Sequence, residues 1–251
     1  MRPHLELSHS RKYTVITCLK KRTPRELPSR TLFSGLTVLL IFTSKPGTMQ
    51  SSLTLLCLGD SYTIGESVMP AQNFPNQTVG LLRKDGYSFE EPEIVAQTGW
   101  TTDELQRAID QHSFKDAYDF VTLLIGVNNQ YRGRTVEAYK AEFESLLKQA
   151  IRFANGKAEH VIVLSIPDWG VMPFANGRDK KRIAIEIDNY NSANKAIAEK
   201  YKVGYIDITP ATREAANDPN LVASDGLHPS AKEYAKWSEN LSALIKSMIK
   251  Q

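Results

Sequence analysis

Five short stretches of this chain are apolar without interruption, and they constrain its fold more than any other feature of the sequence. A strand with one face in water alternates apolar and polar residues, whereas a strand buried on both faces forms a continuous apolar run. Continuous runs therefore favour a parallel sheet covered by helices on both faces. The runs occupy residues 53–59 (LTLLCLG), 93–97 (EIVAQ), 119–126 (DFVTLLIG), 160–165 (HVIVLS) and 203–208 (VGYIDI).

The segments between these runs have the period of amphipathic helices. Two helix starts carry the pattern of a capping box, Thr101 with Glu104 and Ser230 with Glu233. Strands that alternate with helices predict a three-layer α/β/α domain around a central five-stranded parallel sheet, because right-handed crossovers place helices on both faces. The clearest apolar stripes are Tyr139, Phe143, Leu146, Leu147, Ala150 and Ala154 in residues 135–154, and Ile183, Ile187, Tyr190, Asn194, Ile197 and Tyr201 in residues 179–201.

Length and composition fit one compact domain. The 251 residues are 41% hydrophobic and 24% charged, which suits a single large core. We assign this domain to residues 51–251 and place a basic leader, residues 1–50, outside the fold.

The leader differs from the remainder in charge. Residues 1–48 contain nine Lys and Arg against two acidic residues, and the whole chain has a net charge of +3, which leaves −4 on residues 49–251. A mildly acidic domain lacks the basic surface that binds nucleic acid, so we expect no nucleic-acid partner. The leader also holds an apolar run from Leu32 to Phe42, which is shorter than the roughly 20 residues of a membrane span.

Three interpretations of the leader stay open. It is an upstream extension of a protein that starts at Met49, an export signal, or a membrane anchor. A start at Met49 predicts a cytoplasmic protein, and the other two predict an exported or membrane-anchored one. Contact with a membrane is expected only if the leader is retained.

Cysteine and glycine patterns exclude several classes of site. Cys18 and Cys57 are the only cysteines, so no disulfide framework is expected, and Cys57 is predicted to be a small buried hydrophobic residue. No spacing typical of metal ligands is present, and neither GxGxxG nor a P-loop follows the first apolar run. We therefore expect no metal, nucleotide or flavin cofactor.

Polar residues follow the predicted strands at the points where the strands end. In open α/β sheets, ligands bind beyond the carboxyl ends of the strands. Each of these residues also has a simpler interpretation as a helix cap or a turn residue. Their occurrence at successive strand ends favours one common site. They are Asp60 and Ser61 after the first run, Gly99 after the second, Asn128 and Asn129 after the third, and Asp225 and His228 past the fifth.

The residue types suit acyl transfer through a serine. A serine hydroxyl becomes a nucleophile when a neighbouring imidazole takes its proton, and an acceptor must hold that imidazole in one tautomer. Asp225 lies three residues before His228, so one loop can deliver both to Ser61. Attack on an acyl carbon places negative charge on oxygen, and the backbone N–H groups of Ser61 and Gly99 with the side-chain amide of Asn128 are candidate donors to it.

These blocks resemble the SGNH (GDSL-type) hydrolase family over residues 53–249. The serine block is GDSYTIGE, the glycine block is Gly99, the asparagine block is GVNN and the last block is DGLHP. The resemblance implies a flavodoxin-like α/β/α fold and metal-free hydrolysis through an acyl-serine intermediate. It also implies Ser61 as nucleophile, His228 as base, Asp225 as orienting acid, and Ser61, Gly99 and Asn128 as the oxyanion hole.

The asparagine block departs from the family pattern at one position. The family usually has Gly-x-Asn-Asp, and this chain has Asn129 at the fourth place. That position supports the loop, so the placement of Asn128 depends on it. Asp60 is expected to tie the turn that carries Ser61 to its neighbours.

The leading hypothesis is a carboxylic ester hydrolase that takes a small acyl ester. Acyl transfer to another acceptor, deacetylation of sugars, and a catalytically silent module that binds a carbohydrate or an anion are the alternatives. Residues 167–178 form the least regular loop and are expected to set specificity. Candidate pocket residues at the same rim are Tyr62, Trp100, Tyr131, Trp169, Met172, Phe174 and Leu227.

Overall fold

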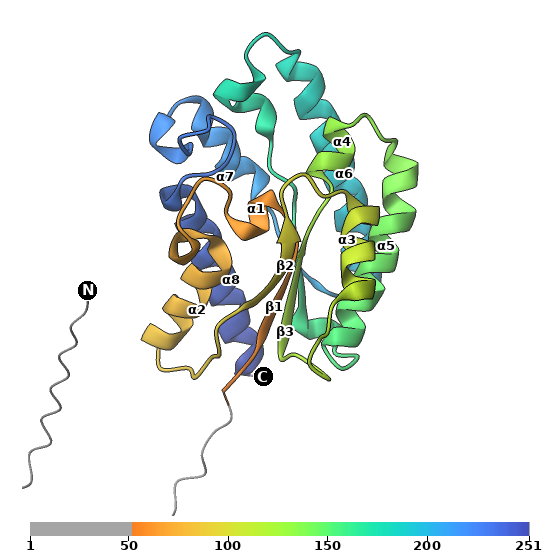
Figure 1. The fold of residues 1–251 in the computed structure, drawn as a ribbon, viewed down its shortest axis with the longest axis vertical. Coiled ribbons are helices and arrows are strands. Elements are labelled where there is room, and N and C mark those ends of the chain that lie inside the picture. The colour runs from red at the N-terminus through yellow and green to blue at the C-terminus, as the bar shows by residue number, and fades with distance from the viewer. Residues whose placement is uncertain (1–51, 251) are drawn as a thin grey trace, which may run out of the picture. The chain divides into compact units, whose positions relative to one another are not determined.

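The computed structural model describes residues 52–250, which contain one parallel sheet of five strands (Figure 1). The strands are β1 (Leu55–Asp60), β2 (Glu93–Gln97), β3 (Phe120–Leu124), β4 (Val161–Leu164) and β5 (Gly204–Ile206). Each lies within one of the predicted runs or extends it by one residue. Their order in the sheet is β2-β1-β3-β4-β5, and all neighbours are parallel. This is the strand order of a flavodoxin-like fold, and the predicted fold class is confirmed.

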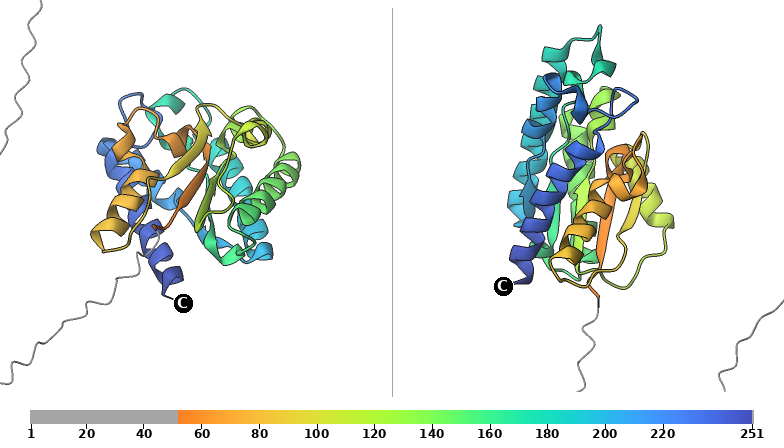
Figure 2. Two further views of the ribbon diagram at one scale, coloured as in Figure 1. Left: turned by 60° about the horizontal axis from the view of Figure 1, so that its bottom comes forward. Right: turned by 90° about the vertical axis from the view of Figure 1, so that its left-hand side faces the viewer.

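Helices cover both faces of the sheet, as predicted. On one face α2 (Phe74–Lys84) packs against α8 (Ala231–Ile249), and the right-hand view of Figure 2 shows the two side by side. On the other face α5 (Val136–Phe153) packs between α3 (Thr102–Gln111) and α6 (Lys180–Tyr201). Three short helices follow β1, β3 and β5 closely, namely α1 (Ser61–Ile64), α4 (Val127–Tyr131) and α7 (Thr209–Arg213). Short 3₁₀ turns lie at 70–72, 158–160, 169–171, 173–175, 214–216 and 219–221.

The predicted apolar stripes form the core. Every residue of the stripe predicted for 135–154 is buried. Of the stripe predicted for 179–201, all residues are buried except Tyr201, which is partly exposed. Cys57 is fully buried in β1, and this burial raises the pKa of its thiol to about 12, so it is a packing residue as predicted.

One of the two predicted capping boxes is incomplete. The box at the start of α3 forms. At the start of α8, Ser230 Oγ accepts from the Glu233 N–H, but the Glu233 carboxylate accepts from Trp237 Nε1 at 3.0 Å instead of reaching back. The Ser230 N–H donates to the Leu221 carbonyl at 2.9 Å. The Ser230 N–H is therefore already paired within the loop before α8. The predicted bond from this N–H to the Glu233 side chain does not form, so that half of the capping box was wrongly predicted.

Residues 52–250 lie within one compact unit, as their contacts show. The leader, with Cys18 and the run from Leu32 to Phe42, lies outside the described residues. Within residues 52–250, none of the helices is both long enough and apolar enough to span a membrane.

Candidate active site

The turn from β1 into α1 presents Ser61. Asp60 is the last residue of β1 and caps α1, because its Oδ1 accepts from the Tyr62 N–H at 3.0 Å. The turn is tight at Gly59, where an added Cβ would lie 2.0 Å from Thr63 Oγ1 and 2.6 Å from the Leu124 carbonyl oxygen. Only glycine fits between α1 and β3 at that point. Ser61 then begins α1 at the carboxyl edge of the sheet, which is where ligands bind in such folds.

Ser61, His228 and Asp225 form a continuous hydrogen-bonded chain. His228 Nε2 lies 2.9 Å from Ser61 Oγ, and His228 Nδ1 lies 2.6 Å from Asp225 Oδ2. With its proton on Nδ1, the imidazole donates to Asp225 and accepts from the serine hydroxyl. Ser61 and His228 are 167 residues apart in sequence, and the fold brings them within proton-transfer distance.

The Asp225 carboxylate is held by several donors. Its Oδ1 accepts from the backbone N–H groups of Leu227 at 2.9 Å and His228 at 3.0 Å, and its Oδ2 accepts from Ser67 Oγ at 2.8 Å. Burial raises the pKa of Asp225, but the hydrogen bonds from the His228 ring and these donors outweigh it and lower the pKa to about 2. Asp225 therefore stays ionised near neutral pH and orients the imidazole.

The three predicted oxyanion donors are not equally placed. Ser61 and Asn128 both line the cavity described below, and Gly99 does not. Asn128 Nδ2 donates to the Trp100 carbonyl at 3.0 Å and to Asp60 Oδ2 at 3.4 Å. Gly99 adopts a positive φ of 84° that glycine favours, and its carbonyl accepts from Arg132 Nη2 at 2.6 Å. The role of all three residues as oxyanion donors stays a prediction.

Asn129 connects α4 to the start of α3. It is fully buried, its Oδ1 accepts from the Thr102 N–H at 3.1 Å, and its Nδ2 donates to Thr102 Oγ1 at 2.6 Å. The Thr102 hydroxyl then donates to Glu142. An amide at position 129 suits this network, because its NH₂ group can donate to the Thr102 hydroxyl oxygen. The Thr102 hydroxyl proton is then available for the bond to Glu142.

Asp60 is the most strongly desolvated acid of the site. It is fully buried, and burial raises its pKa from 3.8 to about 7, although the Tyr62 N–H and the Asn128 amide oppose the rise. Since Asp60 contacts both the Ser61 turn and Asn128, it links two of the predicted blocks as expected.

A cavity of about 160 Å³ lies beside Ser61 and His228, and we call it the Ser61 cavity. The Tyr62 ring packs at a tilt on the His228 ring, with centroids 4.9 Å apart. The rings of Tyr131, Trp169 and Phe174, which also line the cavity, contact one another. The lining residues are Ser61, Tyr62, Val127, Asn128, Tyr131, Trp169, Phe174, Leu227 and His228.

Two of the predicted pocket residues lie elsewhere. The Trp100 carbonyl accepts from Asn128, but Trp100 does not line the Ser61 cavity and instead lines a separate depression with Ala108 and His112. Met172 is fully buried in a small cluster with Ala215 and Leu221 instead of facing the cavity.

Sequence reasoning missed several residues that position the site. Gln130 accepts from Trp169 Nε1 at 2.7 Å and donates to Glu186 at 2.7 Å, which fixes the indole at the cavity wall. Ser67 bonds the carboxylate of Asp225, and Val127 lines the cavity. Gln130 directly follows the GVNN block in the sequence, and this position was the only local indication that it lies near the site. Nothing local to Ser67 points to Asp225, because 158 residues separate them.

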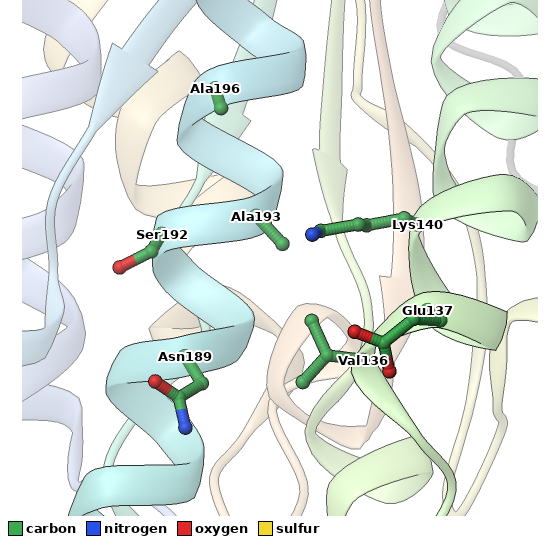
Figure 3. Close-up of a pocket in the computed structure, with 7 residues that line it drawn as sticks. All are labelled: Val136, Glu137, Lys140, Asn189, Ser192, Ala193 and Ala196. Atoms are coloured by element: carbon green, nitrogen blue, oxygen red, sulfur yellow. The ribbon is translucent and has the colours of Figure 1, made fainter.

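A second, larger groove of about 410 Å³ lies between α5 and α6 (Figure 3). Lys140 reaches from α5 toward α6 there, and Glu137 lies on the same helix. None of the predicted site residues lines this groove. Among residues 52–250, no cluster of three His, Cys, Asp or Glu side chains is arranged to hold a metal ion.

Comparison with known proteins identifies the family. The model of the GDSL-like lipase/acylhydrolase family matches residues 57–236. The chain belongs to this family. The SGNH resemblance is thereby confirmed, and membership of a lipase/acylhydrolase family does not favour the silent binding module.

Individual relatives of this GDSL-like protein agree with that assignment. An acetylxylan esterase of Xylanibacter ruminicola is 25% identical over 225 residues, covering 81% of this chain but 45% of the relative, so the chain spans less than half of that protein's length. The solved acetylxylan esterase of Geobacillus stearothermophilus has a TM-score of 0.60 at 21% identity, covering 78% of this chain and 94% of that one. A psychrotrophic esterase from Pseudoalteromonas sp. has a TM-score of 0.59 at 17% identity, with coverages of 79% and 99%. The two solved structures share the fold.

Proposed function

We propose that this GDSL-like protein removes short acyl groups, such as acetyl, from carbohydrate alcohols, with Ser61 as the nucleophile. The observation that carries the proposal is the chain from Ser61 Oγ through His228 to Asp225, with separations of 2.9 and 2.6 Å, at the wall of a small cavity. Ser61 attacks the acyl carbon while His228 Nε2 takes the hydroxyl proton, and Asp225 stabilises the imidazolium that forms.

The second half of the reaction returns the enzyme to its starting state. The C–O bond to the alcohol breaks as His228 gives its proton to the leaving oxygen, and an ester on Ser61 remains. Water then attacks that ester with His228 again acting as base, which releases the acid and restores the serine hydroxyl. The Ser61 N–H and the Asn128 amide, which would release its 3.4 Å bond to Asp60, are the proposed donors to the oxyanion in both steps.

The size and lining of the Ser61 cavity favour a short acyl group. Its volume of about 160 Å³ is below the roughly 300–1,000 Å³ of pockets that enclose drug-sized ligands. Tyr131 and Phe174 are exposed at its edge, where an aromatic face can stack on a sugar ring. The acetylxylan esterase relative supports the same substrate class.

Turnover of p-nitrophenyl acetate by the wild type and by Ser61→Ala tests the nucleophile. We expect kcat to fall by about 10⁴-fold or more in Ser61→Ala, because the other residues of a triad cannot replace its serine. Ser247→Ala, which removes an exposed hydroxyl on α8, is the matched control and should retain full activity. Equal activity of Ser61→Ala and the wild type would refute the mechanism.

Acyl specificity is tested with p-nitrophenyl esters of increasing chain length and with acetylated xylo-oligosaccharides. We expect kcat/KM to be highest for acetate and to fall for octanoate and decanoate, and we expect acetate release from the oligosaccharide. A preference for decanoate would refute the short-acyl proposal while leaving ester hydrolysis intact.

A further inference from the structure

A guanidinium group lies against the aromatic side of the Ser61 cavity. Arg178 Cζ lies 5.1 Å from the ring centroid of Tyr131, 5.3 Å from that of Trp169 and 5.4 Å from that of Phe174. Arg178 Nη2 also donates to the Tyr131 hydroxyl at 3.2 Å. All three rings line the cavity, so the guanidinium contacts the same aromatic side chains that a substrate in the cavity would contact.

Arg178 has no ionic partner in the described part of the chain. Among residues 52–250, no carboxylate oxygen lies within 4.0 Å of its guanidinium nitrogens, and Arg152 is the other arginine in this state. The remaining six arginines in this range each pair with an acid, namely Arg83, Arg107, Arg132, Arg134, Arg182 and Arg213. The charge of Arg178 is therefore available to a ligand.

The residues that directly follow Arg178 carry a net positive charge, with two lysines against one acid. Arg178 stands directly before Asp179, which caps the 22-residue helix α6, and Lys180 and Lys181 lie in the first turn of that helix. The helix dipole adds partial positive charge at the same end. Asp179 Oδ1 accepts a hydrogen bond from the Arg182 N–H at 3.0 Å, and Asp179 forms no ion pair with Arg178 within the described residues.

The side chain is also pre-organised for a planar anion. Contacts with three rings restrict the guanidinium plane, because a cation over an aromatic face is attracted by the ring quadrupole. Its hydrogen bond to Tyr131 uses one of five N–H groups, which leaves donors for two parallel bonds to a carboxylate. A side chain that is already held in place loses less entropy when it binds.

The loop that carries Arg178 is coupled to the catalytic loop. The Arg178 N–H donates to the Ala175 carbonyl at 3.0 Å, and the Phe174 N–H donates to the Gly226 carbonyl at 2.9 Å, next to Asp225. Arg178 itself does not line the Ser61 cavity. An anion bound to it therefore belongs to a part of the substrate that projects beyond the acyl group.

We propose that Arg178, with Tyr131, Trp169 and Phe174, forms a carboxylate-binding subsite, and that the preferred substrate is an acyl ester of an alcohol that carries a carboxylate, such as an acidic sugar. This inference rests on the proposed function and adds the charge of the alcohol to it. A sugar acid combines a ring face for the aromatic side chains with a carboxylate for the guanidinium.

Two acetyl esters of equal size test the subsite. The probes are 4-acetoxybenzoate and 4-acetoxybenzamide, which differ in the charge of one substituent. We expect Arg178→Gln to lower kcat/KM for the benzoate about tenfold, mainly through KM, because the variant loses one charge-assisted contact with the carboxylate at a partly solvated position. Its kcat/KM for the benzamide should stay within about twofold of the wild type.

Two further variants complete the design. Arg178→Lys keeps the charge without the planar fork and should recover part of the benzoate activity. Arg152→Gln removes the other unpaired arginine and should behave as the wild type with both probes. Added salt should narrow the difference between the probes in the wild type and leave Arg178→Gln unchanged.

The outcomes separate the subsite from the reaction. An unchanged ratio of benzoate to benzamide activity in Arg178→Gln would overturn the subsite, and so would an equal loss for both probes, which would mean that Arg178 only supports the loop. Failure of the wild type to hydrolyse either probe in a Ser61-dependent manner would instead overturn the proposed function.

Discussion

Two residues support the site through different carboxylates: Asp60 through its own, and Ser67 through that of Asp225. Asp60 is itself a buried acid that contacts Tyr62 and Asn128. Ser67 is exposed and donates to Asp225 Oδ2, the same oxygen that accepts from the His228 ring. A substitution at Asp60 should therefore change how stability depends on pH. A substitution at Ser67 should instead change the orientation of His228, the proposed base.

Asp60 makes stability depend on pH between about 4 and 7. The folded carboxyl keeps its proton up to a pKa of about 7, whereas the unfolded one loses it near 3.8. A raised pKa stabilises the fold in full below about pH 3.8, and this contribution is lost as the pH rises through 7. We expect the free energy of unfolding of the wild type, relative to non-titrating Asp60→Asn, to fall between pH 4 and pH 8. Urea denaturation at pH 4, 6 and 8 measures it, and a constant difference would contradict the assignment.

Ser67→Gly should reduce catalysis without harming the fold. Ser67 has a φ of 65°, a conformation that glycine adopts without strain, so we expect the free energy of unfolding to change by less than about 1 kcal/mol. Loss of the bond to Asp225 should lower kcat for p-nitrophenyl acetate about tenfold with KM unchanged.

The control for Ser67→Gly is Asn155→Gly, at another residue with positive φ. It tests the backbone change alone and should leave kcat at the wild-type value. Full activity of Ser67→Gly would show that its hydroxyl does not position Asp225.

At the scale of elements, the junction of β1 and α1 decides where Ser61, the proposed nucleophile, lies. The strand, the turn and the helix are within one continuous segment, and the Asp60 cap fixes the direction of α1. Strand β3 pairs with β1, and its Leu124 carbonyl lies against Gly59. This close approach explains why an apolar run ends abruptly in a glycine before Asp60 and Ser61.

Gly59→Ala and Gly80→Ala should have opposite effects on stability. At Gly59 a methyl group overlaps Thr63 and the Leu124 carbonyl, so we expect a loss of about 3 kcal/mol or more and a loss of activity as α1 shifts. Gly80 lies inside α2 with open space around it, and alanine there should raise stability by about 0.5–1 kcal/mol. Urea denaturation of both variants measures this, and equal stabilities would contradict the packing at Gly59.

At the scale of the whole molecule, the packing of α8 on α2 assembles the site. The loop with Asp225 and His228 leads directly into α8, and the Ser61 turn leads through α1 into α2. Two helices that are neighbours on one face of the sheet therefore bring the two ends of the domain together (Figure 1). The strand order places β1 next to β3, so the Asn128 block after β3 reaches the same edge.

The sequence by itself determined the five strands, the helical stripes, the family and the residues of the Ser61, Asp225 and His228 chain. These follow from local periodicity and from residue types at strand ends, which a linear pattern records. Only the tertiary structure decided that Trp100 and Met172 leave the cavity, that Ser67 holds Asp225 and that Arg178 stands against three rings. The reason is that the direction of a side chain depends on neighbours from distant parts of the chain, and no local pattern encodes those contacts.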